Sequence, residues 1–165
     1  MRLVVQKYGG TSVGTPKRIR KVARRLLKTQ SEGCQVVAVI SAMAGATDNL
    51  LKLAHQISSH PTERELDMLL STGEHAAAAL TAMAVNALGG RAASLTGAQA
   101  GILTDRNYTK ARIANISPKQ IHELLSDEPG EFSNPGVKPI ERGSGGGGIR
   151  THGGYSPHTI SSRAH

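Results

Sequence analysis

Along the first 126 residues of the chain, hydrophobic and polar positions follow two different repeats. Short runs rich in β-branched residues predict buried strands at Leu3–Lys7 and Gln35–Ser41, and a shorter run predicts a third strand at Arg91–Leu95. Between these runs, apolar residues recur every three or four positions, which predicts amphipathic helices. Strands that alternate with helices favour a layered α/β domain with a mainly parallel sheet.

The first two predicted helices have ends with clear capping chemistry. The first covers residues 16–28, with Thr15 as its amino-terminal cap, Pro16 at its first position and Gly33 beyond its end. The second begins with Thr47 or Asp48 as its cap and continues to about residue 58. Its predicted buried face consists of Leu50, Leu51, Leu53, Ala54 and Ile57.

The remaining elements are less regular. A helix over 62–70 is predicted to break at Ser71–Glu74 and to resume over 75–88, before two glycines end it. Residues 102–113 are predicted as a hairpin or an irregular arm. A last helix is predicted over 117–126, with Ile121, Leu124 and Leu125 facing inward.

The character of the chain changes after residue 126. Residues 130–165 hold nine of the 19 glycines, and no periodic apolar pattern is present there. We therefore expect a domain over residues 1–127 and a Gly/Pro-rich tail over 128–165 that is disordered or translated from a shifted reading frame. The histidines of the tail lack a coordinating spacing with Cys or acidic partners, so no metal site is predicted.

The charge and the composition of the chain indicate which classes of binding partner to expect. The net charge is +8, but residues 1–30 hold nine Lys or Arg and no acid, while the other 135 residues carry a net charge of −1. On the helix over 16–28 these bases surround an apolar stripe, which favours a solvated basic face over a nucleic-acid or membrane-surface patch. Aromatic residues make up only 2% of the chain, which disfavours base stacking. We expect no nucleic-acid partner.

The apolar stretches and the amino-terminal residues indicate the cellular compartment to expect. No apolar stretch reaches the ~20 residues of a membrane-spanning helix, and the first residues lack the pattern of a secretory leader. We expect a cytoplasmic protein with no membrane partner. The single cysteine, Cys34, lies among apolar neighbours and is predicted to be a buried thiol.

Glycine-rich loops follow the predicted strands and carry the candidate chemistry. Lys7 ends the first strand and leads into a loop of glycines and hydroxyls before a helix, where exposed N–H groups attract phosphate. The spacing is neither that of a Walker A loop nor GxGxxG, and a glycine turn needed only for its backbone angles explains it equally well. The loops 41–48 and 96–101 follow the other strands, so we expect all three at one sheet edge.

An acidic residue at the predicted helix break is a second candidate. Glu74 follows Ser71, Thr72 and Gly73, and its carboxylate could pair with a substrate ammonium group. The alternative is a first-turn glutamate favoured by the helix dipole, which is common in helices.

Four segments together resemble the successive signatures of the aspartate kinase (aspartokinase) family. In order they are KYGGTSVG at residues 7–14, ISAMAGATD at 40–48, LLSTGE at 69–74 and SLTGAQAGI at 94–102. The resemblance covers residues 1 to about 126 and is nearest to the monofunctional, lysine-pathway type. It implies the amino-acid-kinase fold, a three-layer α/β/α sandwich with a mainly parallel sheet, here truncated and followed by a disordered tail.

The resemblance also implies an activity and a set of site residues. An aspartate kinase transfers the γ-phosphoryl group of ATP to the side-chain carboxylate of L-aspartate, the first step towards lysine, threonine and methionine, with Mg²⁺ bridging the phosphates. Lys7 is implied as the catalytic residue, within an ATP-phosphate site of Lys7, Tyr8, Gly9 and Gly10. The implied aspartate-binding residues are Ser41, Thr47 and Glu74.

Members of this family are longer than this chain and form homo-oligomers. Their nucleotide-binding subdomain and regulatory domains have no counterpart in the sequence, so we expect an inactive fragment. Two alternatives stay open: a kinase of the same fold that acts on glutamate or N-acetylglutamate, and a non-catalytic fragment that docks on a full-length kinase. A truncated sheet leaves a strand edge and apolar faces uncovered, so we also expect low solubility.

Overall fold

The computed structural model describes residues 2–105 and 111–126. Its centre is a parallel pair of strands, β1 (Arg2–Tyr8) and β2 (Cys34–Ile40), in a register that pairs Arg2 with Cys34 and Tyr8 with Ile40. The other elements are α1 (Pro16–Ser31), α2 (Ala46–Ile57), α3 (Glu63–Asn86), β3 (Ile102–Thr104), β4 (Ile113–Ile116) and α4 (Lys119–Ser126). The tail over 128–165, for which disorder or a shifted reading frame is predicted, lies outside the described residues.

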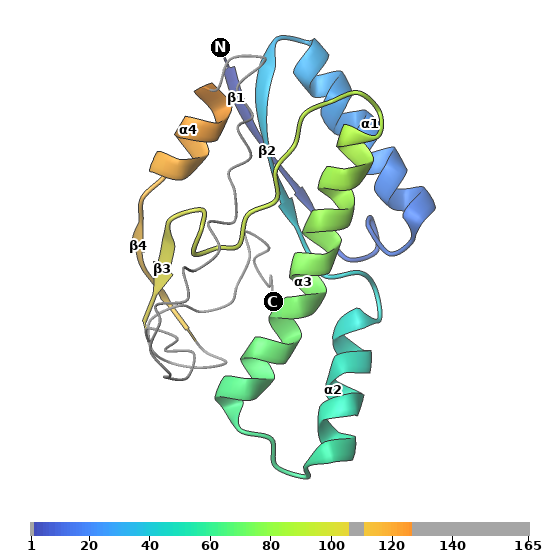
Figure 1. Cartoon of the computed structure of the whole chain (residues 1–165), viewed down its shortest axis with the longest axis vertical. Coiled ribbons are helices and arrows are strands. Elements are labelled where there is room, and N and C mark those ends of the chain that lie inside the picture. The colour runs from blue at the N-terminus through green and yellow to red at the C-terminus, as the bar shows by residue number, and fades with distance from the viewer. Residues whose placement is uncertain (1, 106–110, 127–165) are drawn as a thin grey trace, which may run out of the picture.

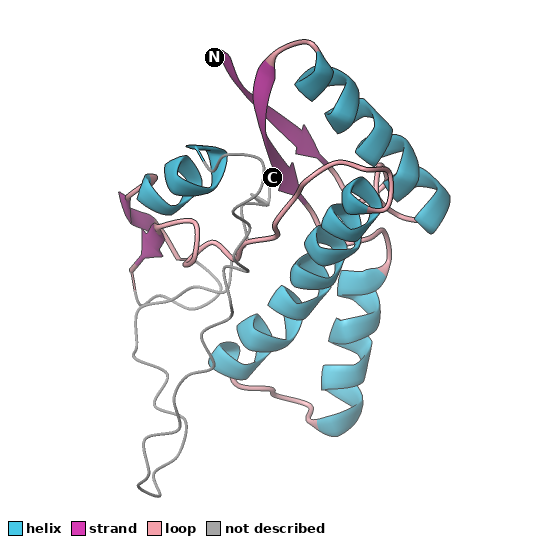
Figure 2. Ribbon diagram, turned by 45° about the horizontal axis from the view of Figure 1, so that its top comes forward, coloured by secondary structure: helices cyan, strands magenta, loops and turns pink. Residues whose placement is uncertain are grey.

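The helices lie on both sides of the central strands. Figure 1 shows α1 on one side of β1 and β2 and α4 on the other, with α3 packed against α1. Strands β3 and β4 form a separate antiparallel hairpin that leads into α4 (Figure 2). The predicted layered α/β architecture and the hairpin are thus confirmed.

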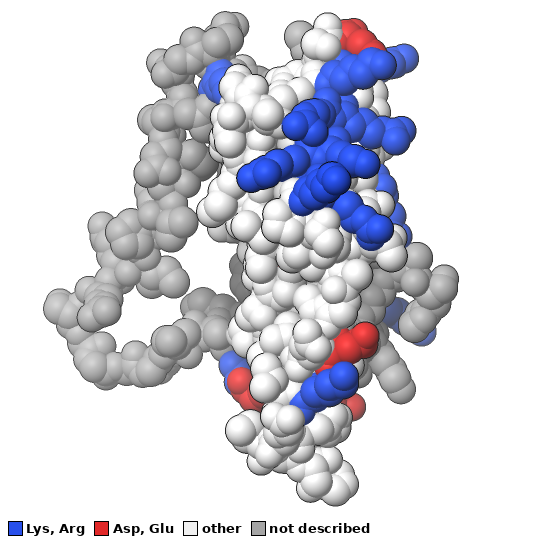
Figure 3. Space-filling model, turned by 90° about the vertical axis from the view of Figure 1, so that its right-hand side faces the viewer, with Lys and Arg blue, Asp and Glu red and all other residues white. Residues whose placement is uncertain are grey.

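The core lies between α1, α3 and one face of the strands. Tyr8 and Ile40 are paired in the register of β1 and β2, so their side chains point to the same face of the sheet, and both are buried there. The buried side of α1 meets them with Ile19, Val22, Ala23 and Leu26, while the lysines and arginines of α1 face outward. Figure 3 shows these basic side chains gathered on one side of the molecule. The predicted amphipathic character of α1 is confirmed.

The capping residues of α1 match the prediction, while those of α2 do not. The hydroxyl oxygen of Thr15 accepts a hydrogen bond from the N–H of Arg18, and Pro16 occupies the first turn. Helix α2 begins earlier than predicted, at Ala46, because Gly45 (φ +80°) turns the chain there and leaves Thr47 inside the first turn. Glycine adopts this left-handed conformation without the steric cost that a β-carbon brings.

Much of the predicted buried face of α2 is exposed. Leu53 is 55% exposed and Ile57 is 89% exposed, whereas Leu50, nearer the start of α2, lies against Gly73 of α3. The prediction of a buried face along the whole helix is therefore wrong for these two side chains.

The predicted break at residues 71–74 is absent, and α3 is one continuous helix. The hydroxyls of Ser71 and Thr72 donate to the carbonyls of Met68 and Leu69, at 2.8 and 2.6 Å, so these polar side chains are satisfied within the helix. Gly73 lies where α3 approaches α2, with Leu50 Cδ1 only 3.4 Å from the position that a β-carbon would take. The glycine serves close packing and does not end the helix.

The predicted third strand at Arg91–Leu95 does not form. In the described part of the chain, β2 pairs with β1 alone, so this segment has no strand beside it. The side-chain amide of Asn86, at the end of α3, instead holds both backbone groups of Ala92, at 2.7 and 3.1 Å. A strand requires a partner, and here a helix-terminal side chain takes the hydrogen bonds.

Candidate active site

The glycine loop after β1 turns sharply and is held by its own backbone. The N–H of Ser12 donates to the carbonyl of Gly9 at 2.9 Å, and that of Val13 donates to Gly10 at 3.3 Å. Val13 is fully buried and fixes the loop to the core. Lys7, next to the buried Tyr8, points to the opposite face of the strand and is exposed, so its ammonium group is accessible to a ligand.

The loop after β2 lies directly against this glycine loop. The N–H of Ser41 donates to the carbonyl of Tyr8 at 3.1 Å, and the N–H of Ala44 donates to the carbonyl of Gly10 at 3.2 Å. A β-carbon on Gly10 would be 2.7 Å from the carbonyl oxygen of Ala42. Only glycine allows this approach, so the two predicted loops are brought together as expected.

Helix α3 also contributes residues to the cluster that these two loops form. A β-carbon on Gly73 would be 3.5 Å from Cβ of Ala42 and 3.8 Å from Cβ of Ala46, which places Gly73 beside the loop that carries Ser41 and Thr47. Glu74 is the next residue of α3 and is half-buried, as are Ser41 and Thr47. The elements that carry the predicted phosphate-binding and amino-acid-binding residues therefore meet at the carboxyl ends of β1 and β2.

Among the described residues, no hydrogen bond joins the third predicted loop to this cluster. Thr96 and Gln99 bond reciprocally, each side chain accepting from the other's N–H, at 2.9 and 3.1 Å. The N–H of Ser117 donates to the carbonyl of Gly101 at 2.8 Å, which ties the loop to the start of α4. The loop folds on itself and braces the hairpin, because the strand expected to carry it to the sheet edge is not formed.

A chain of hydrogen bonds anchors the end of β1 to α1. The hydroxyl of Tyr8 donates to Oε1 of Gln6 at 2.5 Å, Nε2 of Gln6 donates to the hydroxyl of Thr29 at 2.8 Å, and that hydroxyl donates to the carbonyl of Arg25 at 3.2 Å. Burial raises the pKa of the Tyr8 phenol above 10.0, and the nearby Arg25 charge opposes the rise. Tyr8 therefore holds the start of the glycine loop as a neutral hydrogen-bond donor.

We expect Tyr8→Phe to lower the free energy of unfolding by about 1 kcal/mol, because it removes the hydroxyl and leaves the Gln6 amide oxygen with one partner fewer. The raised pKa makes the native stability constant below pH 10 and lower above it, since the unfolded phenol ionises first. Urea unfolding of both proteins between pH 8 and pH 11 measures this, and the difference between them should shrink above about pH 10. A constant difference across this range would contradict the role assigned to the phenol.

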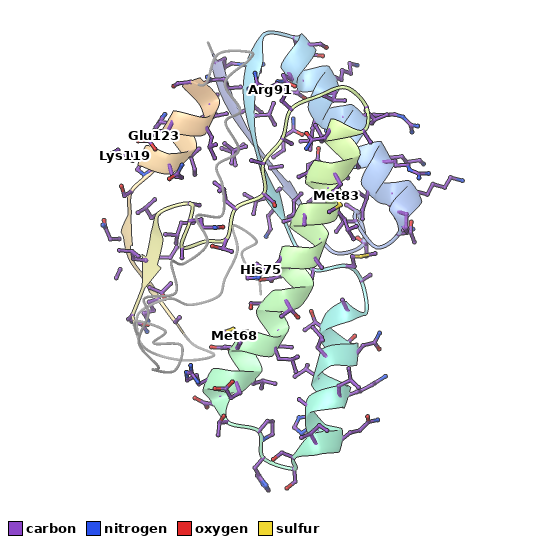
Figure 4. The ribbon with its side chains drawn as sticks, in the orientation of Figure 1. Met68, His75, Met83, Arg91, Lys119 and Glu123 are labelled. Carbon is purple, nitrogen blue, oxygen red and sulfur yellow. The ribbon has the colours of Figure 1, made fainter. Side chains whose placement is uncertain are left out.

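Two residues near Glu74 have no counterpart in the sequence predictions. Asp67 is buried on α3, and its spacing to Ser71 and Glu74 puts all three on one face of the helix. His75 has a buried Nε2 that finds no hydrogen-bond partner among residues 2–105 and 111–126, and it lies on the side of α3 away from α2 (Figure 4). The spacing of polar residues at positions 67, 71 and 74 indicates one polar helix face that includes Asp67. This face is not predicted from the sequence, because a helix break is expected at residues 71–74.

Neither a metal cluster nor a membrane helix is found in the described part of the chain. Residues 2–105 and 111–126 contain no group of three or more His, Cys, Asp or Glu side chains arranged to hold a metal ion. Over the same residues, no helix is both long enough and apolar enough to cross a membrane. Cys34 is buried, as predicted.

Residues 2–140 match the model of the amino acid kinase family, and the chain belongs to that family. Curated proteins that are similar to this chain include aspartokinases. It is 50% identical to the aspartokinase of Geobacillus stearothermophilus and 48% identical to that of Mycolicibacterium smegmatis, over 127 residues in each case. These matches cover 77% of this chain and 31% and 30% of the two relatives.

A solved structure agrees with the sequence matches. The crystal structure of aspartate kinase from Synechocystis superposes with a TM-score of 0.64 and 45% identity, over 74% of this chain and 20% of that one. The resemblance drawn from the four segments is confirmed, and with it the amino-acid-kinase fold. The chain spans about three tenths of the length of the aspartokinases that it matches.

Proposed function

We propose that residues 2–126 are the amino-acid-binding and phosphoryl-binding part of an aspartate kinase. The observation that carries the proposal is the contact of three elements at one point: Gly10 against Ala42, and Ala42 against Gly73 beside Glu74. Each of these elements carries one of the four segments that resemble the family. Their meeting supports one shared site for an amino acid and a phosphoryl group.

Lys7 and the glycine loop serve the phosphoryl group. Its negative charge spreads over three oxygens during transfer, and the exposed Lys7 ammonium offsets that charge as a point cation. Gly9 and Gly10 allow the phosphate to approach the backbone closely, because neither has a side chain. Tyr8 contributes through its backbone, since its phenol is committed to Gln6 on the other face.

Glu74, Ser41 and Thr47 serve the amino acid. The Glu74 carboxylate pairs with the ammonium group of aspartate, and the two hydroxyls donate to its carboxylates. In the transfer step, an oxygen of the aspartate side-chain carboxylate attacks the γ-phosphorus of ATP, and the bond to the bridging oxygen breaks. The products are ADP and an acyl phosphate, and Mg²⁺ on the ATP phosphates offsets their charge when bound.

Replacing Glu74 by glutamine tests the assignment. Titration calorimetry of the full chain should show weak, saturable binding of L-aspartate, and Glu74→Gln should weaken it by about tenfold or more, because a charge-assisted pair is lost. Glu63→Gln, at the exposed start of α3, is the matched control and should bind as the unchanged chain does. Equal aspartate affinity in Glu74→Gln and in the unchanged chain would remove Glu74 from the site.

The same titration separates the alternative substrates. Binding of glutamate or N-acetylglutamate in preference to aspartate would favour the other kinases of this fold. N-acetylglutamate has no free ammonium group, so its binding should not depend on Glu74. For the complete protein we infer a cytoplasmic location and a homo-oligomer, and the absence of a nucleic-acid partner stays a prediction.

A further inference from the structure

One edge of β2 carries backbone groups that no described residue pairs. The N–H of Ser41 donates to the carbonyl of Tyr8, so the odd-numbered peptide groups of β2 face β1. Peptide groups alternate in direction along a strand, so those of Val36 and Ala38 face away from β1. The sheet formed by β1 ends at β2 among the described residues, which leaves this edge open.

An apolar cavity of about 720 Å³ runs along this open edge. One wall is β2 itself, and the opposite wall is the extended segment 91–95, which passes between α3 and β3 (Figure 2). Apolar side chains of α1, α3 and α4 complete the lining, among them Leu27, Val85 and Leu124. Five consecutive residues of β2, 35–39, are only half-buried, although strands between two helical layers are normally buried.

The end of α4 marks where an added strand would begin. Nε2 of Gln35 donates to the carbonyl of Leu125 at 2.8 Å, so the last turn of α4 lies at the amino end of β2. A strand that follows such a helix and fills the cavity runs parallel to β2, as β1 does on the other side, and the segment that follows the matched region in the relatives has this place. The residues that directly follow α4 in the sequence, 128–135, are unsuited to that strand, since they contain two prolines and no β-branched residue.

We propose that the space beside β2 is a strand-accepting site that takes one extended, apolar strand from a second polypeptide, parallel to β2. The relatives of this chain are about three times as long, so the occupant of choice is a strand from the part of an aspartokinase that this chain does not cover. Main-chain hydrogen bonds to Val36 and Ala38 give affinity, and the apolar lining selects the side chains. The proposal is independent of aspartate binding, because it uses a different edge of β2.

The probe is a synthetic peptide of about ten residues, long enough for one strand. Its sequence is the one that directly follows the matched segment in the Geobacillus stearothermophilus aspartokinase, with a dye and a lysine tail added. Fluorescence anisotropy with the full chain should show saturable binding, and a scrambled peptide should not bind. Amide hydrogen exchange at Val36 and Ala38 should slow when the peptide is added, whereas Val37 and Val39, which face β1, should change little.

A pair of variants at one position tests the edge itself. Ala38→Pro removes an outward N–H without touching the pairing with β1, and should weaken peptide binding by about tenfold. Ala38→Ser keeps that N–H and should bind as the unchanged chain does. Thermal melts test whether both variants fold. If Ala38→Pro does not fold, the hydrogen-exchange pattern of the unchanged chain decides whether the peptide binds along the outward edge of β2.

Three results would overturn the proposal. They are the absence of saturable binding at millimolar peptide, equal binding by a folded Ala38→Pro variant, and protection spread over the molecule instead of along the outward edge of β2. Self-association with protection at Val36 and Ala38 before any peptide is added would assign the edge to a second copy of the chain, and the proposed partner would be wrong.

Discussion

Gly101→Ala is expected to destabilise the chain by at least about 2 kcal/mol, a large share of the stability of a domain of this size. Gly101 has φ +79°, and a β-carbon there would be 1.8 Å from the carbonyl oxygen of Ser117. Both atoms of that contact belong to the junction between the 96–101 loop and the start of α4. The backbone must separate there, and the hydrogen bond from Ser117 to Gly101 is lost with it.

Gly89→Ala separates the two causes of this destabilisation, which are the positive φ and the overlap with Ser117. Gly89 has nearly the same φ, +83°, but nothing lies within 4 Å of its β-carbon position, so this variant carries the backbone penalty alone, about 1 kcal/mol. Urea unfolding of both variants measures the difference, which is the cost of the Ser117 overlap. If Gly101→Ala and Gly89→Ala were equally stable, the close approach at Ser117 would have no energetic role.

Gly10→Ala is expected to weaken aspartate binding by about tenfold and to cost about 1–3 kcal/mol of stability. Its φ is ordinary, so the effect comes from the overlap of the new methyl group with the carbonyl of Ala42, at 2.7 Å. That carbonyl belongs to a backbone segment and cannot rotate away as a side chain would. The segment also carries Ser41 and leads to Thr47, so its displacement disturbs the amino-acid side of the site.

Gly9→Ala is the neighbouring control for this overlap. Nothing lies within 4 Å of a β-carbon on Gly9, so this variant should fold with stability within about 0.5 kcal/mol of the unchanged chain. Calorimetric titration with L-aspartate and a thermal melt, carried out on both variants, give the two quantities. Unchanged aspartate binding in Gly10→Ala would show that contact between the two loops does not shape the site.

The elements that the sequence predicts well are those whose signals are local. Helix α1 is the clearest case, because Thr15, Pro16 and the apolar stripe all lie within the element that they define. The strands β1 and β2 are likewise correct, since their β-branched runs pack against helices close in sequence. These features need no knowledge of the rest of the molecule.

The elements that are predicted wrongly depend on distant partners. Ser71, Thr72 and Gly73 have the chemistry of a loop, yet they continue α3, because the hydroxyls bond within the helix and the glycine accommodates α2. The segment 91–95 has the composition of a strand, but a strand forms only beside another one. Neither contact can be deduced from the local sequence.

The candidate site was predictable in part for the same reason. The proximity of the glycine loop and the loop after β2 follows from parallel strands that end at the same edge, and it is observed. The position of Glu74 within a continuous helix, and the buried neighbours Asp67 and His75, required the structure. The roles of Lys7, Tyr8, Gly9, Gly10, Ser41, Thr47 and Glu74 stay predictions until the binding measurements are made.

Low solubility also stays a prediction, and exposed apolar side chains on two elements support it. Val5 is 64% exposed and Leu3 is 44% exposed on the face of β1 opposite α1, while Met83 is 63% exposed on α3. Apolar groups of this size on a strand and a helix favour association with other chains.

The outward face of α1 has a consequence for the conditions in which the chain folds. Its seven bases include four pairs of like charge spaced four residues apart, and no ion pair reaches them from the described residues. Each such pair opposes the helix, so the buried side of α1 holds it against its own electrostatic repulsion. Dissolved salt screens that repulsion within about 10 Å. The stability of this helix thus depends both on the packing of its buried side and on counter-ions from the solvent. In dilute buffer the counter-ions no longer screen the repulsion, so the helix is less stable there.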